Sequence, residues 1–454
     1  VKNYRPISLL CSVSKVLERC IFNHLYPFVD DHLHPLQHGF IKGRSCATQL
    51  LKVYHSIGSI LDKGGQVDVV FLDFSKAFDC ISHNLLLHKL EHFYGIGGCL
   101  LKWIEDYLSN RTQRVLMESK CSSWLPVLSG VPQGSIIGPL FFLLFINDLP
   151  SVALNCTTAL FADDSKCFKE INDPSDCILL QNDLNAMFEW SQRWNMNFNP
   201  SKCKILTITR RCHPVFYNYL MNGTSLEHVG SFTDLGVLID EKLTFNPHIN
   251  QLISKCNKMC GFIKRSLGFR APTIVKFRLY ESLCVSLLNY CSPVWSPQNI
   301  GNVKKIESVQ RSMTKYILNS YDLSYVQRCT DLKILPLCFR REINDLLFFF
   351  KCLHGLIHVD FRSEFVFINS SRDLRSANDL LLSAQPVRTE CFKSSYFNRI
   401  VRLWNLLPLL TRQCTSLNSF KQKVTLFYAD KFVNFNVDRF CSWTSTCRCQ
   451  GYYH

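Results

Sequence analysis

The sequence predicts an α+β fold in which an antiparallel sheet forms a layer with helices. Four short runs rich in β-branched and aromatic residues predict strands, and a longer segment with apolar side chains at helical spacing predicts a helix. Asp163 and Asp164 fall between two of these strands, where a tight hairpin turn is expected. The expected strands are residues 67–74, 157–161, 166–169 and 205–209, and the expected helix is residues 176–194.

The composition is that of a globular chain with excess positive charge. The 454 residues include 51 Lys and Arg against 36 Asp and Glu, for a formal charge of +15. Hydrophobic residues make up 47% and charged residues 19%, which excludes disorder, and the length suggests two or more domains. The dense apolar runs are shorter than the ~20 residues of a membrane helix, so we expect no membrane partner. The positive charge favours the binding of polyanions such as nucleic acid.

The charge is unevenly distributed along the chain. The net values are +3 over residues 1–62, −4 over 63–240, +9 over 241–330 and +7 over 331–454. This segregation predicts a middle part built around carboxylates, with flanking parts that hold something anionic.

The 23 cysteines are scattered singly along the chain. Because no signal peptide or dense framework accompanies them, we interpret most as buried free thiols of an intracellular protein, in the nucleus or the cytoplasm. Two groupings are weighed as metal sites, but neither has the usual zinc spacing. They are Cys256 with Cys260, and the tail Cys441, Cys447, Cys449 and His454.

A second helix is expected over residues 249–267. Its apolar residues form one stripe, while Lys255, Lys258, Lys264 and Arg265 fall off that stripe. The pattern predicts a helix with a core side and a basic side. The apolar positions are Ile249, Leu252, Ile253, Cys256, Cys260, Ile263 and Leu267.

Three aspartates stand where adjacent strands would end. Asp73 ends the first strand, and Asp163 and Asp164 lie at the hairpin. Antiparallel neighbours can bring these carboxylates together, and a divalent cation with oxygen ligands would offset their repulsion. Two such ions, about 3.5 to 4 Å apart, are the usual device for in-line displacement at phosphorus. The alternative is that an Asp-Asp pair in a tight turn is ordinary turn chemistry.

These aspartates belong to an ordered set of sequence blocks. The blocks are residues 3–10, 37–45, 73–79, 129–139, 161–164, 199–203 and 235–236, followed more weakly by 290–295 and 404–408. In this order the set resembles the motifs of reverse transcriptases, most closely those of non-LTR (LINE-type, jockey-like) retrotransposons. The resemblance covers residues 3 to about 240. It implies a right-hand polymerase with fingers, an antiparallel palm sheet and a thumb, followed by a mostly helical C-terminal region.

The resemblance implies a division of the chain and a set of metal ligands. Partial fingers would occupy residues 1–62, the palm 63–240, a thumb-like basic helical region 241–330, and a C-terminal region of unknown role 331–454. Asp73 and Asp163 would bind metal, with Asp164 beside them and the Phe74 carbonyl completing the shell. Hard oxygen ligands suit two Mg²⁺ ions, with Mn²⁺ as a second candidate.

The resemblance also implies substrate contacts, each with a plainer alternative. The ring of Phe78 would lie beneath the incoming sugar and clash with a 2′-hydroxyl, or it is simply core. Gln133 and Gly134 would lie against nucleotide and template, where Gly permits close approach, or they form only a tight turn. The guanidinium of Arg5 would meet the triphosphate, or it is a surface cation.

Basic residues complete the implied site. Lys202 matches a lysine that protonates the departing pyrophosphate, with Lys204 as a nearby competitor. Lys42 and Arg44 would touch the template backbone. Thumb contacts to duplex phosphates would come from Lys255, Lys258 and Arg265. For each of these residues the alternative is a solvated surface cation.

The implied activity is RNA-directed DNA polymerisation, in which dNTPs are added to a primer 3′-OH. The partners would be an RNA template and a DNA primer or target DNA. The chain starts at Val1, so we expect a fragment, with the family's endonuclease domain and first fingers strand upstream and absent here. The alternative is a catalytically inactive, nucleic-acid-binding remnant of such an element.

Overall fold

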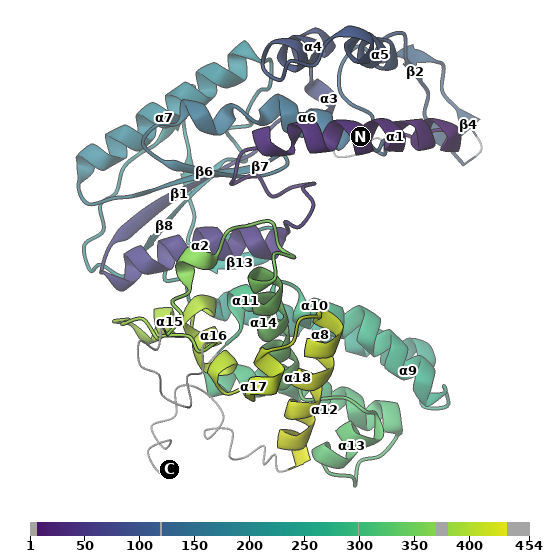
Figure 1. The fold of residues 1–454 in the computed structure, drawn as a ribbon, viewed down its shortest axis with the longest axis vertical. Coiled ribbons are helices and arrows are strands. Elements are labelled where there is room, and N and C mark those ends of the chain that lie inside the picture. The colour runs from purple at the N-terminus through teal and green to yellow at the C-terminus, as the bar shows by residue number, and fades with distance from the viewer. Residues whose placement is uncertain (1–6, 119, 298, 369–379, 434–454) are drawn as a thin grey trace. The chain divides into compact units, whose positions relative to one another are not determined.

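The structure is a computed structural model that describes residues 7–118, 120–297, 299–368 and 380–433 (Figure 1). It confirms the α+β prediction. The chain divides into two compact units: residues 1–49 with 65–230, and residues 50–64 with 231–454. Helix α2 (Cys46–Asp62) begins in the first unit and continues in the second.

A five-stranded sheet with the order β11-β8-β1-β7-β6 forms the centre of the first unit. All neighbours are antiparallel except β11 and β8, which are parallel. The four strands expected from the sequence all form, with ends that differ by a few residues. These four are β1 (Gln66–Leu72), β6 (Thr157–Phe161), β7 (Asp164–Glu170) and β8 (Lys204–Thr209), and the fifth strand of the sheet is β11 (Glu227–His228).

Helices and short ribbons complete the first unit. The helices are α1 (Ser12–Val29), α3 (Ala77–Cys80), α4 (His83–His92), α5 (Gly98–Leu108), α6 (Gly138–Ile146) and α7 (Pro174–Arg193), with 3₁₀ turns η1 (Asp30–His32) and η2 (Leu149–Val152). The ribbons pair β2 (Thr112–Gln113) with β5 (Leu125–Pro126), β3 (Leu116–Met117) with β4 (Lys120–Cys121), and β9 (Leu220–Met221) with β10 (Thr224–Ser225).

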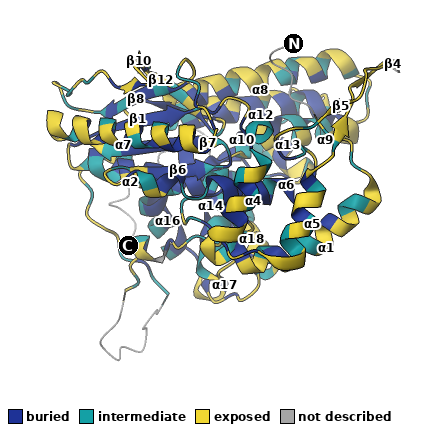
Figure 2. Cartoon of the chain, turned by 90° about the horizontal axis from the view of Figure 1, so that it is seen from above, coloured by how far each residue is buried: buried dark blue, intermediate teal, exposed yellow. Residues whose placement is uncertain are grey.

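The core of the first unit explains why these segments fold as they do. Every residue of β1 is buried, including the polar Gln66 and Asp68, and Figure 2 shows the strand in the colour of buried residues. Helix α6 is buried at every position except Pro139, so each large side chain contributes roughly 1.5–3 kcal/mol. Helix α7 starts where the Asp173 carboxylate accepts the Ser175 amide, and it packs against β7.

The second unit is mostly helical. It contains residues 50–64 and a hairpin of β12 (Ser231–Asp234) and β13 (Val237–Asp240), which was predicted to belong to the middle part of the chain. The helices are α8 (Asn246–Leu267), α9 (Thr273–Tyr280), α10 (Ser286–Asn289), α11 (Ser292–Trp295), α12 (Ile300–Leu318), α13 (Tyr325–Asp331), α14 (Leu337–Leu353), α15 (Glu390–Lys393), α16 (Tyr396–Asn405), α17 (Leu409–Arg412) and α18 (Leu417–Val433), with a π turn η3 (Glu281–Val285) and a 3₁₀ turn η4 (Arg362–Glu364).

Helix α8 has the two sides that its sequence predicts. The stripe positions Ile249, Leu252, Cys256, Cys260 and Ile263 are buried, and Ile253 and Leu267 are half-buried. On the other side Lys255, Lys258 and Arg265 are exposed. The helix therefore presents three cations to solvent.

Residues 331–433 pack with the helices before them into one unit. The buried carboxylate of Asp345 in α14 accepts two hydrogen bonds from the Arg399 guanidinium in α16, at 2.9 and 3.0 Å. The Arg399 Nη2 atom, which makes the second of these bonds, also donates to the Pro293 carbonyl at 2.7 Å and so ties α16 to α11. Phe349 and Phe350 are fully buried in this core, as the aromatic run predicts.

The cysteines agree only in part with the sequence-based prediction. All 20 cysteines of the described residues are free thiols, but only ten of them are buried. Cys260 and Cys284 lie with their sulfur atoms 3.6 Å apart in the core of the second unit. The tail group that includes Cys441 and His454 lies outside the described residues.

Within the described ranges, no helix combines the length and apolarity needed to cross a bilayer.

One buried histidine makes the second unit sensitive to acid. The Nδ1 atom of His248 accepts a hydrogen bond from the Leu238 amide at 3.2 Å and so joins α8 to β13. The ring packs edge-on against Trp295, with centroids 5.3 Å apart. Burial, and next the nearby Lys255 charge, lower the pKa of His248 to about 4. The neutral ring is therefore the form that the fold stabilises.

We expect this residue to reduce stability below pH 6.5. The pKa of His248 is lower in the folded protein than in the unfolded one. Its contribution to the free energy of unfolding is therefore full above pH 6.5 and falls by about 3 kcal/mol as the pH approaches 4. Urea denaturation of the wild type and His248→Asn at pH 7.5 and 4.5 measures the effect. The variant keeps an acceptor and should lose clearly less stability on acidification. Identical pH dependence of the two proteins would contradict the assignment.

Candidate active site

The register of the central strands brings the predicted acids to one end of the sheet. The last β1–β7 pair is Leu72 with Ser165, so Asp73 follows one step beyond it. On the other side of β7, Phe161 pairs with Asp164 and closes the β6–β7 hairpin. Asp73 and the β6–β7 hairpin turn therefore lie at the same end of the sheet.

The hairpin turn differs in one detail from the prediction. Its two central residues are Ala162 and Asp163, while Asp164 is already the first residue of β7. Ala162 has a φ of +54°, as the first central position of a type II′ turn requires. Asp163 is half-buried and Asp164 is exposed, so the two neighbouring acids occupy different environments.

Asp73 is held by the segment that precedes β8. Its amide donates to the Cys203 sulfur at 3.4 Å, and its carbonyl accepts the Asn199 amide at 2.8 Å. The rings of Phe74 and Phe198 stack beside it with centroids 4.3 Å apart. Burial raises the pKa of Cys203 to about 11, so this thiol stays neutral next to the carboxylate.

The structure distinguishes the two candidate lysines by position. Lys202 Nζ lies 3.3 Å from Asp73 Oδ2 and its side chain is 64% exposed, so it can move. Lys204 Nζ is bound to Glu227 at 2.6 Å and to the Ser201 carbonyl at 2.9 Å. Lys202 is therefore at the acidic sheet end, whereas Lys204 is held away from it.

The described residues contain no ready-made cluster of three or more His, Cys, Asp or Glu side chains that could share one ion. The expected grouping of Asp73, Asp163 and Asp164 is thus not formed as a single cluster, consistent with the repulsion of adjacent carboxylates. The donor chemistry nevertheless fits a hard divalent cation. Asp73 Oδ2 is shielded from solvent, and the charge beside it is the exposed Lys202 ammonium at 3.3 Å.

Phe78 packs on the core but is not fully buried, and its contact with a nucleotide stays a prediction. Its ring stacks on the buried Phe142 of α6, with centroids 4.2 Å apart, and meets the exposed Phe40 edge-on at 6.1 Å. One face is thus fixed by the core while the ring remains half-buried. The Phe78 carbonyl accepts the Val131 amide at 2.9 Å, which links this segment to the loop that carries Gln133.

The Gln133 loop is fixed by its neighbours on both sides. The Gln133 side chain donates to the Asp79 carboxylate at 2.9 Å. The backbone carbonyl of Gln133 accepts the Ser8 amide at 2.8 Å. Gly134 has a φ of +117°, and a Cβ atom there would lie 2.8 Å from the Ser8 carbonyl oxygen. Gly134 is therefore required by a close approach of backbone to backbone.

A buried glutamate that the sequence analysis missed supports the same loop. Glu18 in α1 is 1% exposed, and its Oε2 accepts the Ile136 and Ile137 amides at 2.7 and 3.4 Å. Tyr107 donates to its other oxygen at 3.2 Å. Nothing in the spacing of charged residues along α1 marks Glu18, because the two amides that it binds are more than 100 residues away in sequence.

The other basic residues predicted to contact the triphosphate or nucleic acid do not lie together. Arg5 lies outside the described residues. Lys42 is exposed, whereas the Arg44 guanidinium donates to the carbonyls of His34, Pro35 and Gln37, at 3.1, 3.1 and 2.6 Å. Arg44 thus has a role within the fold, and its contact with a template stays a prediction. Lys255, Lys258 and Arg265 belong to the second unit.

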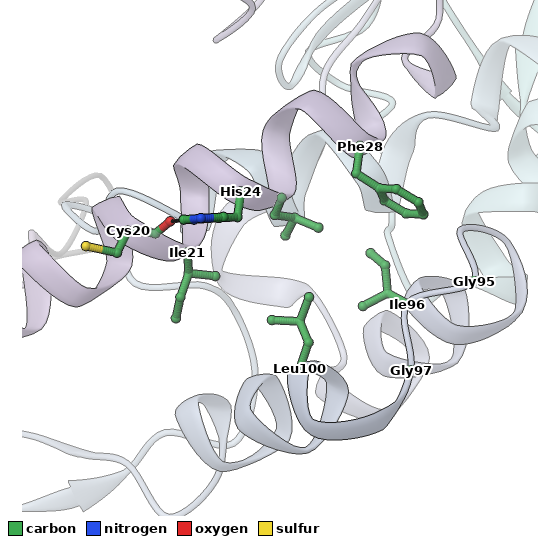
Figure 3. A pocket seen from close by; sticks show the side chains of 9 residues that line it. Cys20, Ile21, His24, Phe28, Gly95, Ile96, Gly97 and Leu100 are labelled. Carbon is green, nitrogen blue, oxygen red and sulfur yellow. Dashed lines mark hydrogen bonds between the residues drawn. The ribbon is translucent and has the colours of Figure 1, made fainter.

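An apolar groove of about 650 Å³ lies elsewhere in the first unit, between α1 and the start of α5 (Figure 3). It contains none of the predicted site residues, and its lining carries almost no charge. Its lining residues are Cys20, Ile21, His24, Leu25, Phe28, Gly95, Ile96, Gly97 and Leu100. The acidic sheet end is therefore the better candidate for chemistry.

A family model described as reverse transcriptase (RNA-dependent DNA polymerase) matches residues 1–239. The chain therefore belongs to the reverse transcriptase family, which confirms the resemblance seen in the sequence blocks. Membership implies a polymerase that depends on a divalent metal.

The relatives specify the branch of the family. The RNA-directed DNA polymerases from mobile element jockey of Drosophila melanogaster and Drosophila funebris are 29% and 30% identical, over 70% of this chain. The probable polymerase from transposon X-element of Drosophila melanogaster is 28% identical over 69% of the chain. These are non-LTR retrotransposon proteins, and the chain spans 36% of the length of the jockey polymerases.

Solved structures similar to this chain include the telomerase of Candida tropicalis in complex with a fragment of telomeric RNA. The identity is 11% and the TM-score 0.41, over 92% of this chain and 56% of that chain.

We expect Glu18 to be essential for the order of the Gln133 loop. Removing a buried carboxylate that holds two amides costs about 3 kcal/mol, so Glu18→Ala should be less stable by that amount. Glu18→Gln keeps an acceptor and should lose less. Chemical denaturation measures stability, and hydrogen exchange of residues 133–138 measures loop order. Unchanged exchange in Glu18→Ala would refute this role.

Proposed function

We propose that this chain carries out RNA-directed DNA polymerisation for a non-LTR retrotransposon. It would add dNTPs to the 3′-OH of a DNA primer or of target DNA, with RNA as the template. The observation that supports this most directly is the strand register, which sends Asp73 and Asp163 out of one edge of the sheet. Two carboxylates at the ends of rigid neighbouring strands are a suitable base for phosphoryl chemistry.

We infer that the divalent metal is Mg²⁺, as two ions, with Mn²⁺ able to replace it. Asp73, Asp163 and the Phe74 carbonyl would hold it, with Asp164 beside them, because all four supply hard oxygen atoms. When bound, such ions lower the pKa of an attacking hydroxyl and stabilise the leaving pyrophosphate. The chain's own contribution is to fix these oxygens on β1 and on the β6–β7 hairpin.

Substrate positioning would come from two linked segments. Phe78, supported from below by Phe142, offers an aromatic surface to the sugar of the incoming nucleotide. Gln133 and Gly134 lie in a loop bonded to that segment, so a shift of one would move the other. Arg5 would contact the triphosphate, and Lys42 and Arg44 the template backbone, as the family resemblance implies.

Lys202 is the favoured general acid. Its ammonium reaches Asp73 at 3.3 Å, and its exposed side chain is free to turn toward a departing pyrophosphate. Lys204 is a poorer candidate because Glu227 already neutralises it.

We further propose that residues 1–62 act as partial fingers, 63–240 as palm and 241–330 as thumb, with residues 331–454 extending the helical region. The support for the thumb is the row of exposed cations on α8, opposite a buried apolar stripe. Such cations would bind duplex phosphates without regard to sequence.

The polymerase proposal is tested by primer extension on poly(rA) with oligo(dT) in Mg²⁺. Asp163→Ala removes a metal ligand and should lower the extension rate by roughly 10³-fold or more. Asp173→Ala is the matched control, because this acid only caps α7 and should leave the rate within about 3-fold. Extension that does not depend on Asp163, or no extension by the wild type, would refute the proposal and favour an inactive nucleic-acid-binding remnant.

The thumb proposal is tested by the salt dependence of duplex binding. Replacing Lys255, Lys258 and Arg265 by Ala should weaken binding at low salt and reduce the slope of log K against log salt by about 2.7, because each phosphate contact contributes about 0.9. Lys304→Ala with Lys305→Ala, two exposed lysines on α12, controls for the loss of net charge and should change the slope less. An unchanged slope in the triple variant would exclude α8 as the contact surface.

A further inference from the structure

A short segment outside the sheet extends it next to the acidic hairpin. The Leu160 amide donates to the Leu36 carbonyl at 3.0 Å, and the His38 amide donates to the Leu160 carbonyl at 2.9 Å. These bonds place Gln37 opposite Leu160 as a parallel bridge beside β6. Residues 36–38 therefore cover the free edge of β6, two residues before the turn that carries Asp163.

The Gln37 side chain reaches the turn itself. The residue is 1% exposed, and its Oε1 accepts the Gly39 amide at 2.8 Å and the Ala162 amide at 3.0 Å. Two N–H donors at one oxygen fix the orientation of this side-chain amide. The Ala162 amide belongs to the Phe161–Ala162 peptide, so the bond fixes the backbone where it enters the turn, directly before Asp163.

The turn needs this support because its backbone is strained. A non-glycine residue at positive φ, such as Ala162 at +54°, costs roughly 1–2 kcal/mol. Glycine would adopt this conformation freely, but alanine needs its surroundings to hold it there. A hydrogen bond from the Ala162 amide to a buried, immobile acceptor supplies that restraint.

The neighbouring residues hold Gln37 rigidly. A Cβ atom on Gly39 would lie 2.3 Å from the Ala162 nitrogen, so only glycine allows the segment to touch the turn. Arg44 donates to the Pro35 and Gln37 carbonyls at 3.1 and 2.6 Å and fixes the segment from its other side. The acceptor is thus part of a packed frame.

We propose that Gln37 is a positioning residue that sets the orientation of Asp163 through the Ala162 amide. The inference rests on the proposed polymerase function, because it assigns Gln37 a purpose in that reaction. Loss of the Oε1 acceptor would free the Phe161–Ala162 peptide at the entry of the turn to rotate, and the Asp163 carboxylate would move with the turn. A displacement of about 1 Å at a reacting group can reduce the rate roughly 10²-fold.

Three variants separate positioning from stability. Gln37→Met keeps the size of the side chain and removes the acceptor, whereas Gln37→Glu keeps the acceptor. Thr48→Val is the matched control, because it removes a buried hydrogen bond to His38, the next residue, at 2.8 Å without touching the turn. All three should lose some stability, so stability alone does not decide the question.

The first readout is hydrogen exchange of residues 158–166, which needs no catalytic activity. In Gln37→Met the exchange of this segment should be roughly 10-fold faster than in the wild type, while Thr48→Val should leave it unchanged. Equal exchange in Gln37→Met and the wild type would overturn the inference whether or not the chain is a polymerase.

The second readout is kinetic. In primer extension, Gln37→Met should lower kcat roughly 10²-fold with the KM for dTTP within about 3-fold, and should raise the Mn²⁺ concentration for half-maximal binding, measured by EPR, roughly 10-fold. Gln37→Glu should restore kcat to within about 10-fold of the wild type, and Thr48→Val should stay within about 3-fold. If the wild type extends primers in an Asp163-dependent way but Gln37→Met matches it, the positioning role is wrong and the polymerase proposal stands.

Discussion

The hydrogen-bonded ladder of β1, β7 and β6 is the constraint on which the site depends. Side chains alternate along a strand, so a shift of one residue would turn Asp73 to the other face and away from the hairpin. The observed register, from Val67–Glu170 to Leu72–Ser165, keeps Asp73 on the side of the hairpin. The positions of these acids therefore depend on how β1 packs and pairs in the sheet.

Loops around this sheet are held by single buried polar residues. Glu18 binds the amides after Gly134, and Gln37 binds the amide before Asp163. Both residues come from the first 50 positions of the chain, while the segments they hold lie more than 100 residues later. Thus the N-terminal part contributes to the site by shaping it, beyond any contact of its own with substrate.

Much of the fold and of the candidate site could be predicted from the sequence because the patterns that indicate them lie within short segments. The β-branched run of β1, the stripe of α8 and the strands around the hairpin depend on neighbouring residues alone, and all of them form. The functions of Glu18, Gln37 and Arg44 could not be predicted, because each depends on partners that only the folded chain brings near. The same reason explains why Lys202 and Lys204 could not be ranked before the ion pair of Lys204 with Glu227 was known.

The most direct test of the account is the location of metal at the sheet edge. Crystals of the protein with template, primer and dNTP in Mn²⁺ would show the ions by anomalous scattering. We expect two peaks about 3.5–4 Å apart, with ligands from both Asp73 and Asp163. Ions bound without either of these carboxylates would contradict the central claim that strand register builds the active site.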